Sequence, residues 1–211
     1  MNVIARKRIA ASLKLNFFEG IFILSPFRSL VQRHLEARQL LDLGGPAAGK
    51  TVLEVGCGPG GGIELIYDFF GATAVDAFDM DSKMIARIRQ RKSYRKPTTH
   101  LWTGNVRQIP VASNRYDAVF NFGFIHHVVN WRAALEEVFR VLKPGGRFFC
   151  EEILKHYITH PVWGRLMKHP QNDRFDRTAF VLALKQSGFD VRRIREMANL
   201  YLWVIADKPG E

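Results

Sequence analysis

Short apolar runs alternate with stretches of helical periodicity along most of this chain. The run Thr51–Val55 is β-branched and apolar, which is typical of a strand buried in a parallel sheet, and Ile63–Phe70 has the spacing of a helix. The same pattern predicts further elements: a strand ending at Asp79, a helix over 82–91, a short strand over 100–103, a helix over 176–187 and strands over 189–197 and 200–206. This alternation indicates an α/β fold.

Two further segments have weaker patterns. Ser25 and Pro26 form a cap and first-turn pair, and the apolar spacing after them predicts a helix that ends at Gly44-Gly45-Pro46. Beyond Cys150 the chain is rich in His and Pro, and it is predicted to be irregular up to about Arg174.

The composition is that of one folded globular domain. The chain has 211 residues, of which 47% are hydrophobic and 24% are charged, so it can bury one sizeable core. Its two cysteines, Cys57 and Cys150, do not suggest a disulfide framework, and we expect both to be reduced and buried. These features favour a cytoplasmic location.

A glycine-rich loop follows the first buried strand. Gly56, Gly58 and Gly60 let the backbone come close to a ligand and adopt positive φ angles. Asp79 lies 21 positions after Gly58, where a carboxylate can accept hydrogen bonds from both hydroxyls of a ribose. Strand, glycines, helix and acid together predict a site for a cofactor that contains adenosine.

The segment Glu54–Gly60 resembles the first motif of class I S-adenosylmethionine-dependent methyltransferases, an acidic residue followed by Gly-x-Gly-x-Gly. The resemblance is closest to the small-molecule, type 11-like branch, and it extends over about residues 50 to 154. Gly104-Asn105-Val106 resembles the family's Gly-Asp-x motif, with Asn105 in place of the acid. Arg115–Asn121 resembles the family's fourth strand. Ala134–Phe148, which includes Pro144-Gly145-Gly146, resembles the family's helix, turn and fifth strand.

The resemblance implies the whole architecture. We expect a Rossmann-like, doubly wound sheet of seven strands in the order 3-2-1-4-5-7-6, with the last strand antiparallel. Residues 1–48 would form an N-terminal helical extension or lid, and residues 49–211 the methyltransferase domain. The stretch 155–175 would be the loop on the acceptor side.

The resemblance also implies the cofactor, S-adenosylmethionine, and its product, S-adenosylhomocysteine. Their binding residues would then be those of the strand ends and the glycine loop: Glu54, Gly56, Cys57, Gly58, Gly60, Asp79, Met80, Asn105, Val106, Asn121 and Phe122.

The residues after the fourth strand bear on the methyl acceptor. Asn121–Phe124 lacks both prolines of the tetrad found in base amino methyltransferases, and the chain has no Pro-Cys pair of the kind used in cytosine C5 methylation. Phe124–Val128 instead resembles the Leu-His-His segment of small-molecule methyltransferases. His126 and His127 are therefore candidates for the base that takes a proton from the acceptor. The alternative is that they cap the next helix or line the cofactor pocket.

Acidic and histidine side chains beyond the fifth strand do not predict a metal site. Glu151, Glu152, His156, His160 and His169 show no tight zinc spacing. Glu151 and Glu152 also lie near the acceptor in the family fold, and because adjacent strand residues alternate, only one of them should face the pocket.

Neither the net charge nor the N-terminal segment identifies the methyl acceptor. The net charge is +11, which favours polyanions, but no RNA-binding module is present. Residues 1–24 join a basic start to apolar and aromatic residues; we expect a lid over the site, with peripheral membrane contact as the alternative, and no transmembrane span. The favoured acceptor is a small or lipid-like molecule. The alternatives are an RNA or protein methyltransferase, or a non-catalytic cofactor-binding protein.

Overall fold

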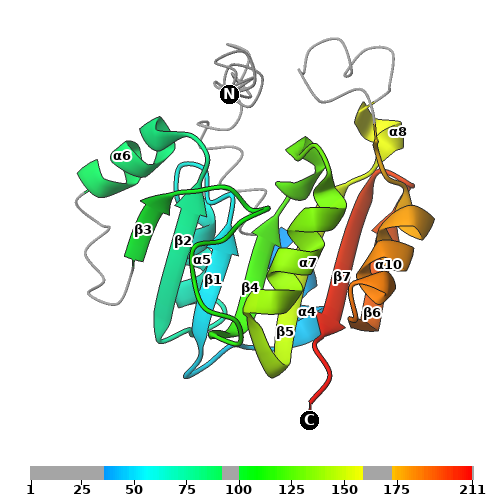
Figure 1. The fold of residues 1–211 in the computed structure, drawn as a ribbon, viewed down its shortest axis with the longest axis horizontal. Coiled ribbons are helices and arrows are strands. Elements are labelled where there is room, and N and C mark those ends of the chain that lie inside the picture. Colours follow the sequence, from blue (N-terminus) through cyan, green and yellow to red (C-terminus); the bar gives the residue numbers. More distant parts are fainter. Residues whose placement is uncertain (1–35, 92–99, 159–172, 211) are drawn as a thin grey trace, which may run out of the picture.

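A computed structural model describes residues 36–91, 100–158 and 173–210 of the chain. Within these ranges seven strands form one sheet in the order β3-β2-β1-β4-β5-β7-β6, as expected (Figure 1). The strands are β1 (Thr51–Val55), β2 (Ala74–Asp79), β3 (His100–Thr103), β4 (Tyr116–Phe122), β5 (Leu142–Ile153), β6 (Asp190–Met197) and β7 (Tyr201–Asp207). The first five are mutually parallel, and β7 runs antiparallel to both β5 and β6.

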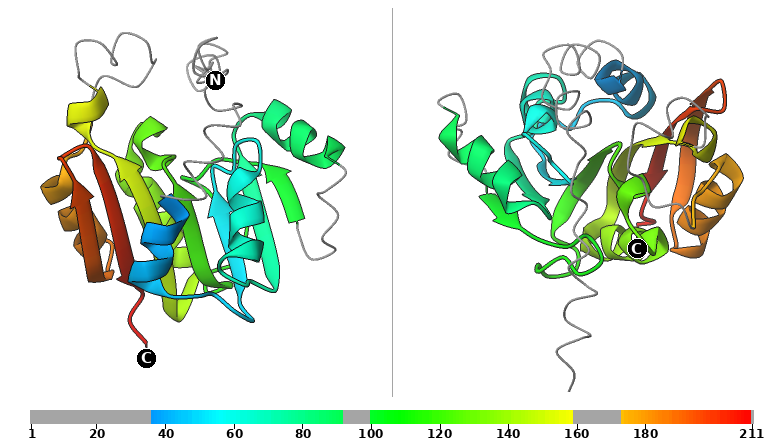
Figure 2. Two further views of the ribbon diagram at one scale, coloured as in Figure 1. Left: turned by 180° about the vertical axis from the view of Figure 1, so that it is seen from behind. Right: turned by 90° about the horizontal axis from the view of Figure 1, so that it is seen from above.

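Helices cover both faces of this sheet. α7 and α10 pack on one face, while α4 and α5 pack on the other, which Figure 2 shows from behind. The helices are α4 (Ala37–Gly44), α5 (Gly61–Asp68), α6 (Ser82–Gln90), α7 (Trp131–Val141), α8 (Lys155–Ile158) and α10 (Arg177–Gln186), with a single 3-10 turn η2 (Ile125–His127). The predicted helix that starts near residue 25 is described only for its last part, and it ends at Gly44 as expected.

Two hydrophobic cores result, one on each face. Trp131 of α7 stacks on Phe180 of α10 in the first core. In the second core the rings of Phe120 and Phe149 stack with their centroids 4.4 Å apart, and Phe70 meets Phe120 edge-on at 4.7 Å. The apolar strands β1 and β4 contribute side chains to both cores because successive side chains of a strand point to opposite faces of the sheet.

The start and end of β5 differ from the sequence prediction. The helix does stop before Pro144, and the predicted turn at Pro144-Gly145-Gly146 lies inside β5, which begins at Leu142 directly after α7 and shifts register against β4. The N–H of Gly145 donates to the carbonyl of Lys208, and the N–H of Lys208 donates to that of Gly146, while Gly145 has a positive φ of 74°, so the predicted turn persists as an irregularity at the start of β5. At the other end β5 continues to Ile153 because β7 pairs with it that far.

The stretch predicted to be irregular up to Arg174 contains α8, a single helical turn. The remainder of that stretch, residues 159–172, lies outside the described residues, as do residues 1–35 with the predicted lid. Among the helices that are described, none is long and apolar enough to cross a bilayer.

The aromatic cluster allows a test of the second core. Phe120→Ala removes a fully buried ring between Phe70 and Phe149 and leaves a cavity. We expect the free energy of unfolding to fall by about 3 to 5 kcal/mol, measured by urea denaturation. Leu182→Ala on α10 is the control, because that side chain is 54% exposed and its truncation should cost less than about 0.5 kcal/mol. Similar losses in both variants would contradict the packing described here.

Candidate cofactor and acceptor site

The glycine loop lies at the carboxyl end of β1, at the upper edge of the sheet in Figure 1. Gly58 has a φ of 50°, and a Cβ placed there would meet none of the described residues within 4 Å, so within that part of the chain this side of the loop has room for a ligand. Gly56 is required for a different reason, since a Cβ on it would lie 2.0 Å from the ring of Phe124. The loop after β1 therefore packs against the segment after β4 while staying open above.

Asp79, at the end of β2, joins the glycine loop to the start of α6. Its Oδ2 accepts the N–H of Gly58 at 2.9 Å, and its Oδ1 accepts the N–H of Asp81 at 2.8 Å. Each carboxylate oxygen keeps a second lone pair for a ligand. Burial raises the pKa of Asp79, while the two backbone donors oppose that rise.

Two nearby acidic residues are hydrogen-bonded within the domain. This supports the prediction that Asp79 is the acid that binds the ribose. Asp76 accepts hydrogen bonds from the Tyr116 hydroxyl at 2.8 Å and from Arg115 at 3.2 Å. Asp81 caps α6 by accepting the N–H of Lys83.

Glu54 is a buried acid beneath the same loop. Its Oε2 has no hydrogen-bond partner among the described residues, and a Cβ on Gly62 at the start of α5 would lie 2.0 Å from its Oε1. Burial raises the pKa of Glu54 well above its ordinary value, and the charge of Asp79 raises it further. An unsatisfied buried carboxyl oxygen fits a ligand that brings a hydrogen-bond donor or a positive charge.

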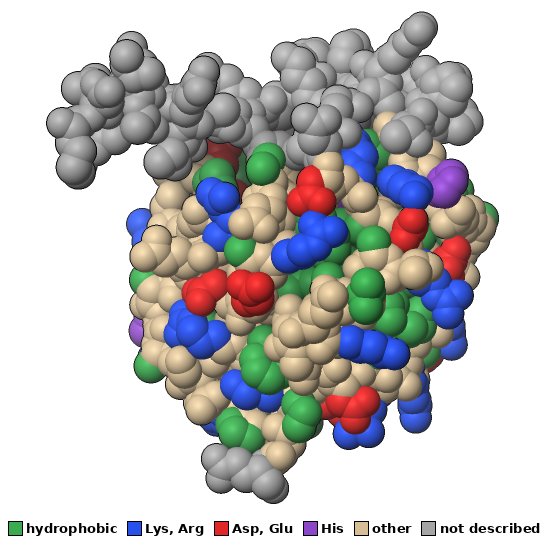
Figure 3. Space-filling model, turned by 45° about the vertical axis from the view of Figure 1, so that its right-hand side comes forward, with side chains coloured by type: hydrophobic (Ala, Val, Ile, Leu, Met, Phe, Trp, Pro, Cys, Tyr) green, Lys and Arg blue, Asp and Glu red, His purple; other side chains and the backbone are tan. Residues whose placement is uncertain are grey.

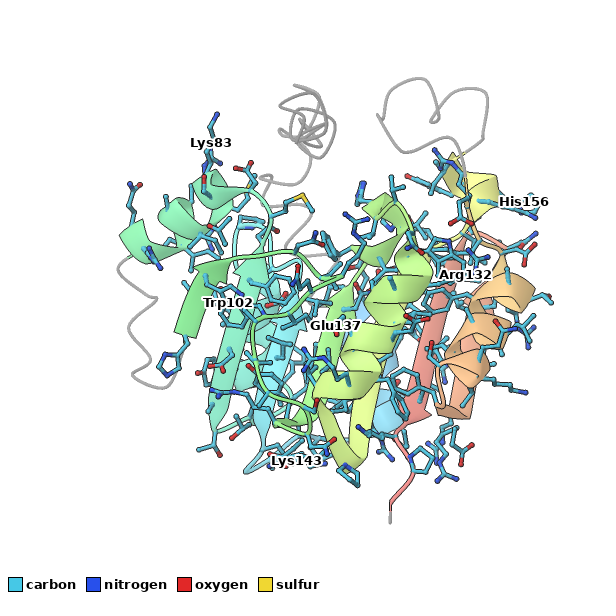
Figure 4. The ribbon with its side chains drawn as sticks, viewed as in Figure 1. Lys83, Trp102, Arg132, Glu137, Lys143 and His156 are labelled. Carbon is cyan, nitrogen blue, oxygen red and sulfur yellow. The ribbon has the colours of Figure 1, made fainter. Side chains whose placement is uncertain are left out.

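The segment after β3 borders the site on its other side. The N–H of Gly104 donates to the carbonyl of Asp79, and Val106 is fully buried. The Oδ1 of Asn105 accepts the N–H of Arg107 at 3.0 Å, which uses one of its two lone pairs. Trp102, labelled in Figure 4, stacks on Phe78 with their ring centroids 5.2 Å apart.

The remaining residues predicted to bind the cofactor have varied surroundings. The side chain of Met80 is 43% exposed, whereas Cys57 is buried and Phe122 packs in the second core. Asn121 is fully buried, and its amide donates to the carbonyl of Glu151 and to Glu152. Both cysteines are free and buried, as expected.

Glu152 organises the segment after β4. Its Oε1 accepts hydrogen bonds from Asn121 Nδ2 and from the N–H of Ile125, both at 2.7 Å. Its Oε2 lies 2.7 Å from Nδ1 of His126. This carboxyl, which is fully buried, therefore fixes both the η2 turn and the orientation of the imidazole. Of the two adjacent glutamates, Glu152 is the one that is hydrogen-bonded to His126.

Burial also affects the protonation of Glu152 and His126. It raises the pKa of Glu152 to about 8, and the donors from Asn121, Ile125 and His126 oppose that rise. A single proton between Oε2 of Glu152 and Nδ1 of His126 satisfies both atoms without placing two charges in the core. His127, the other candidate base, is half-buried, with its ring centroid 4.1 Å from that of His126.

A small pocket, here called the acceptor-side pocket, opens next to His126. Its apolar wall consists of Val128, Ile153, Ile158 and Phe175. Its polar wall consists of His126, Lys155, Asp173 and Arg174. The sequence pattern did not identify Arg174, which precedes a helix cap and carries no motif; only the fold brings it beside His126.

The described residues contain no group of three or more His, Cys, Asp or Glu side chains that could hold a metal ion. His160 and His169, which were considered as ligands, lie outside these residues.

Known proteins resemble this chain in sequence. A family model described as a methyltransferase domain matches residues 52–146. A probable S-adenosylmethionine-dependent methyltransferase of Mycolicibacterium smegmatis is 39% identical over 101 residues, which cover 48% of this chain and 37% of that protein. A fatty-acid O-methyltransferase of the same species is 33% identical over 119 residues, covering 56% of this chain and 42% of the relative. The chain thus spans less than half the length of these relatives.

Two solved structures share the fold. One is a chain from the complex of the Haloferax volcanii Trm112 methyltransferase activator with a methyltransferase (TM-score 0.75, 18% identity, 94% of this chain and 100% of that chain). The other is geranyl diphosphate C-methyltransferase from Streptomyces coelicolor, solved with S-adenosyl-L-homocysteine (TM-score 0.66, 16% identity, 82% of this chain and 79% of that chain). This chain carries a class I S-adenosylmethionine-dependent methyltransferase domain.

The methyltransferase domain has a donor set that fits its cofactor. S-adenosylmethionine presents ribose hydroxyls, an ammonium group and a sulfonium. Asp79 retains lone pairs for hydroxyl donors, Glu54 provides a buried acceptor with no described partner, and Gly58 leaves the loop open. These groups lie at the carboxyl ends of β1 and β2, where ligands bind in open α/β sheets.

Asp79 can be tested by its effect on cofactor affinity. We expect Asp79→Ala to weaken S-adenosylmethionine binding by about 1 to 3 kcal/mol, through loss of charge-assisted hydrogen bonds, measured by calorimetry. Asp81→Ala is the control: it removes the cap of α6 and should lower stability by about 1 kcal/mol with little change in affinity. Unchanged affinity in Asp79→Ala would show that another acid holds the ribose.

Glu152 can be tested through the pH dependence of stability. Its pKa is about 8 in the folded protein, against an ordinary value of 4.5, so between these values the folded chain keeps a proton that the unfolded chain has released. Stability should therefore fall as the pH rises through this window, by at most about 1.4 kcal/mol per pH unit. Glu152→Gln cannot ionise and should show a shallower fall by urea denaturation. Parallel curves for the two proteins would contradict the raised pKa.

Proposed function

We propose that this protein transfers a methyl group from S-adenosylmethionine to a small-molecule or lipid-like acceptor. The observation that carries the proposal is His126, held by Glu152 at the wall of the acceptor-side pocket, which has one apolar and one polar side. His126 and Lys155 of this pocket follow the carboxyl ends of β4 and β5, which lie at the same edge of the sheet as the ends of β1 and β2 with the glycine loop and Asp79 (Figure 1). The matches to a fatty-acid O-methyltransferase and to phthiotriol/phenolphthiotriol dimycocerosates methyltransferases support an apolar acceptor.

The cofactor contacts follow from the site. We assign the ribose to Asp79 and the positively charged methionyl part to the region of Glu54. The adenine would lie by Asn105 and Val106, whose position next to β3 borders Asp79. We also propose that the cofactor contacts the other residues predicted from the sequence: Gly56, Cys57, Gly58, Gly60, Met80, Asn121 and Phe122. For Asn121 we propose an indirect role, because its amide is occupied by Glu151 and Glu152.

The chemistry is an in-line displacement. The bound cofactor supplies a methyl group on a positively charged sulfur, and a lone pair of the acceptor forms the new bond to carbon as the carbon–sulfur bond breaks. Where the reacting atom of the acceptor carries a proton, His126 takes that proton at Nε2 in the state in which Glu152 is ionised and accepts the N–H of Nδ1, because Nε2 then carries no proton. Positioning by the pocket lowers the remaining barrier.

The basic surface gives less support to a nucleic-acid acceptor. Arg192 pairs with Asp190 and Asp207, and Arg193 donates to the carbonyl of Leu43, so these side chains serve contacts within the domain. On the face drawn in Figure 3, Lys and Arg side chains are interspersed with Asp and Glu. Peripheral membrane contact through residues 1–24 and a cytoplasmic location stay predictions, since that segment lies outside the described residues.

A direct test is transfer of labelled methyl from S-adenosylmethionine to pooled acceptors: fatty acids, fatty alcohols, phospholipids, polar metabolites and RNA. We expect labelling in an apolar pool that saturates with acceptor. Labelling of RNA alone, with a steep dependence on salt, would overturn the proposal in favour of a nucleic-acid enzyme. Absence of cofactor binding at millimolar concentration would support a non-catalytic protein.

His126 can be tested with a substitution that preserves its anchor. In His126→Asn the side-chain amide can still reach Glu152, but the nitrogen that would take the proton is lost. With an acceptor that carries a hydroxyl group, we expect kcat to fall by about 10²- to 10⁴-fold, with unchanged affinity for S-adenosylmethionine. His156→Asn is the control, because His156 is exposed and points away from the domain in Figure 4. Full activity in His126→Asn would remove the base from the mechanism.

A further inference from the structure

Arg174 stands out in the acceptor-side pocket. Its Nε, Nη1 and Nη2 atoms are all buried, and none of them has a hydrogen-bond partner among the described residues. Burial lowers the pKa of this guanidinium, although arginine stays charged in proteins. A buried charge without a partner costs free energy in the folded state, so its presence beside a pocket calls for an explanation.

The other charged groups at the pocket already have partners. The carboxylate of Asp173 accepts from Arg132 at 2.7 Å, and Figure 4 shows Arg132 on the side of α7 nearest α10. Nζ of Lys155 lies 2.6 Å from the carboxylate of Asp176. His126 is hydrogen-bonded to Glu152, as described above. Arg174 therefore contributes the positive charge at this pocket that no described acid neutralises.

The backbone on both sides of Arg174 is fixed. The carbonyl of Asp173 accepts the indole N–H of Trp131 at 2.8 Å, and the carbonyl of Phe175 accepts the N–H of Lys155 at 3.1 Å. The ring of Phe175 packs edge-on against Trp131 in the first core. These contacts hold the arginine at the pocket wall, which is the arrangement expected of a preorganised recognition residue.

We propose that Arg174 binds a carboxylate or phosphate group of the methyl acceptor, whose apolar chain packs against Val128, Ile153 and Phe175. This inference rests on the proposed function, because it specifies the acceptor of the same site. A guanidinium presents paired N–H donors that match a carboxylate or a phosphate in a bidentate way. The acceptor class is thus an anionic amphiphile.

Binding rather than turnover provides the test. Decanoate, decyl phosphate and decanol share one apolar chain and differ in the head group, and their binding can be followed by tryptophan fluorescence, since Trp131 packs against Phe175. We expect the full chain to bind at least one anion about tenfold more tightly than decanol, or about 1.4 kcal/mol. Decanoate preferred over decyl phosphate would identify a carboxylate, and the reverse order a phosphate.

Two substitutions isolate the guanidinium. Arg174→Gln should abolish the preference for the anion and leave the affinity for decanol unchanged, whereas Arg174→Lys should retain part of the preference. Arg177→Gln is the matched control, because Arg177 begins the nearby helix α10 and pairs with Glu196 instead. Equal affinities of the wild type for decanoate, decyl phosphate and decanol, or an unchanged preference in Arg174→Gln, would overturn the inference.

Stability separates recognition from a structural role. If Arg174 is kept for a ligand, Arg174→Gln should have a Tm equal to or higher than that of the wild type, because it removes a buried charge without a partner. Decanoate or decyl phosphate should raise the Tm of the wild type and not that of the variant. A lower Tm in Arg174→Gln would assign the arginine to the fold. If the chain prefers the anion but transfers no methyl group, the proposed function is refuted and this inference stands. If the chain transfers a methyl group but shows no preference for the anion, the proposed function stands and this inference is refuted.

Discussion

The carboxyl group of Glu152 is the constraint on which the acceptor side of this domain depends. It is fully buried, so it must be hydrogen-bonded or neutral, and its partners come from three different segments. Asn121 reaches it from β4, the N–H of Ile125 from the η2 turn, and Nδ1 of His126 from the side chain of that turn. Satisfying one buried group therefore fixes the geometry of the chain where the acceptor would bind.

The position of the cofactor site depends on a second feature of the fold. This feature is the point in the sheet at which the order of the strands reverses. β1 lies between β2 and β4, and the connections after β1 and β4 lead to helices on opposite faces of the sheet. A crevice opens at such a point at the carboxyl ends of parallel strands. The glycine loop, Asp79 and the η2 turn all meet there, and Phe124 fills the space that a side chain on Gly56 would take.

Several buried charges in this domain oppose stability and lie at the same edge of the sheet. Glu54 has an oxygen without a described partner, Glu152 has a raised pKa, and Arg174 has three buried nitrogens without one. Elsewhere the charges are paired in the ordinary way, as for Arg147 with Asp207 and Arg140 with Glu137. Local instability concentrated at one edge is typical of a site arranged for ligands.

The sequence by itself determined the fold and the position of the glycine loop and Asp79 at the ends of β1 and β2. Thr51–Val55, the glycine loop and Asp79 are contiguous or locally spaced, and strand and helix periodicity follow from such short-range patterns. The continuous path from α7 into β5, the network of Glu152 and the approach of Arg174 to His126 were decided only by the tertiary structure. These features join residues tens of positions apart through strand pairing and burial, which a local pattern does not encode.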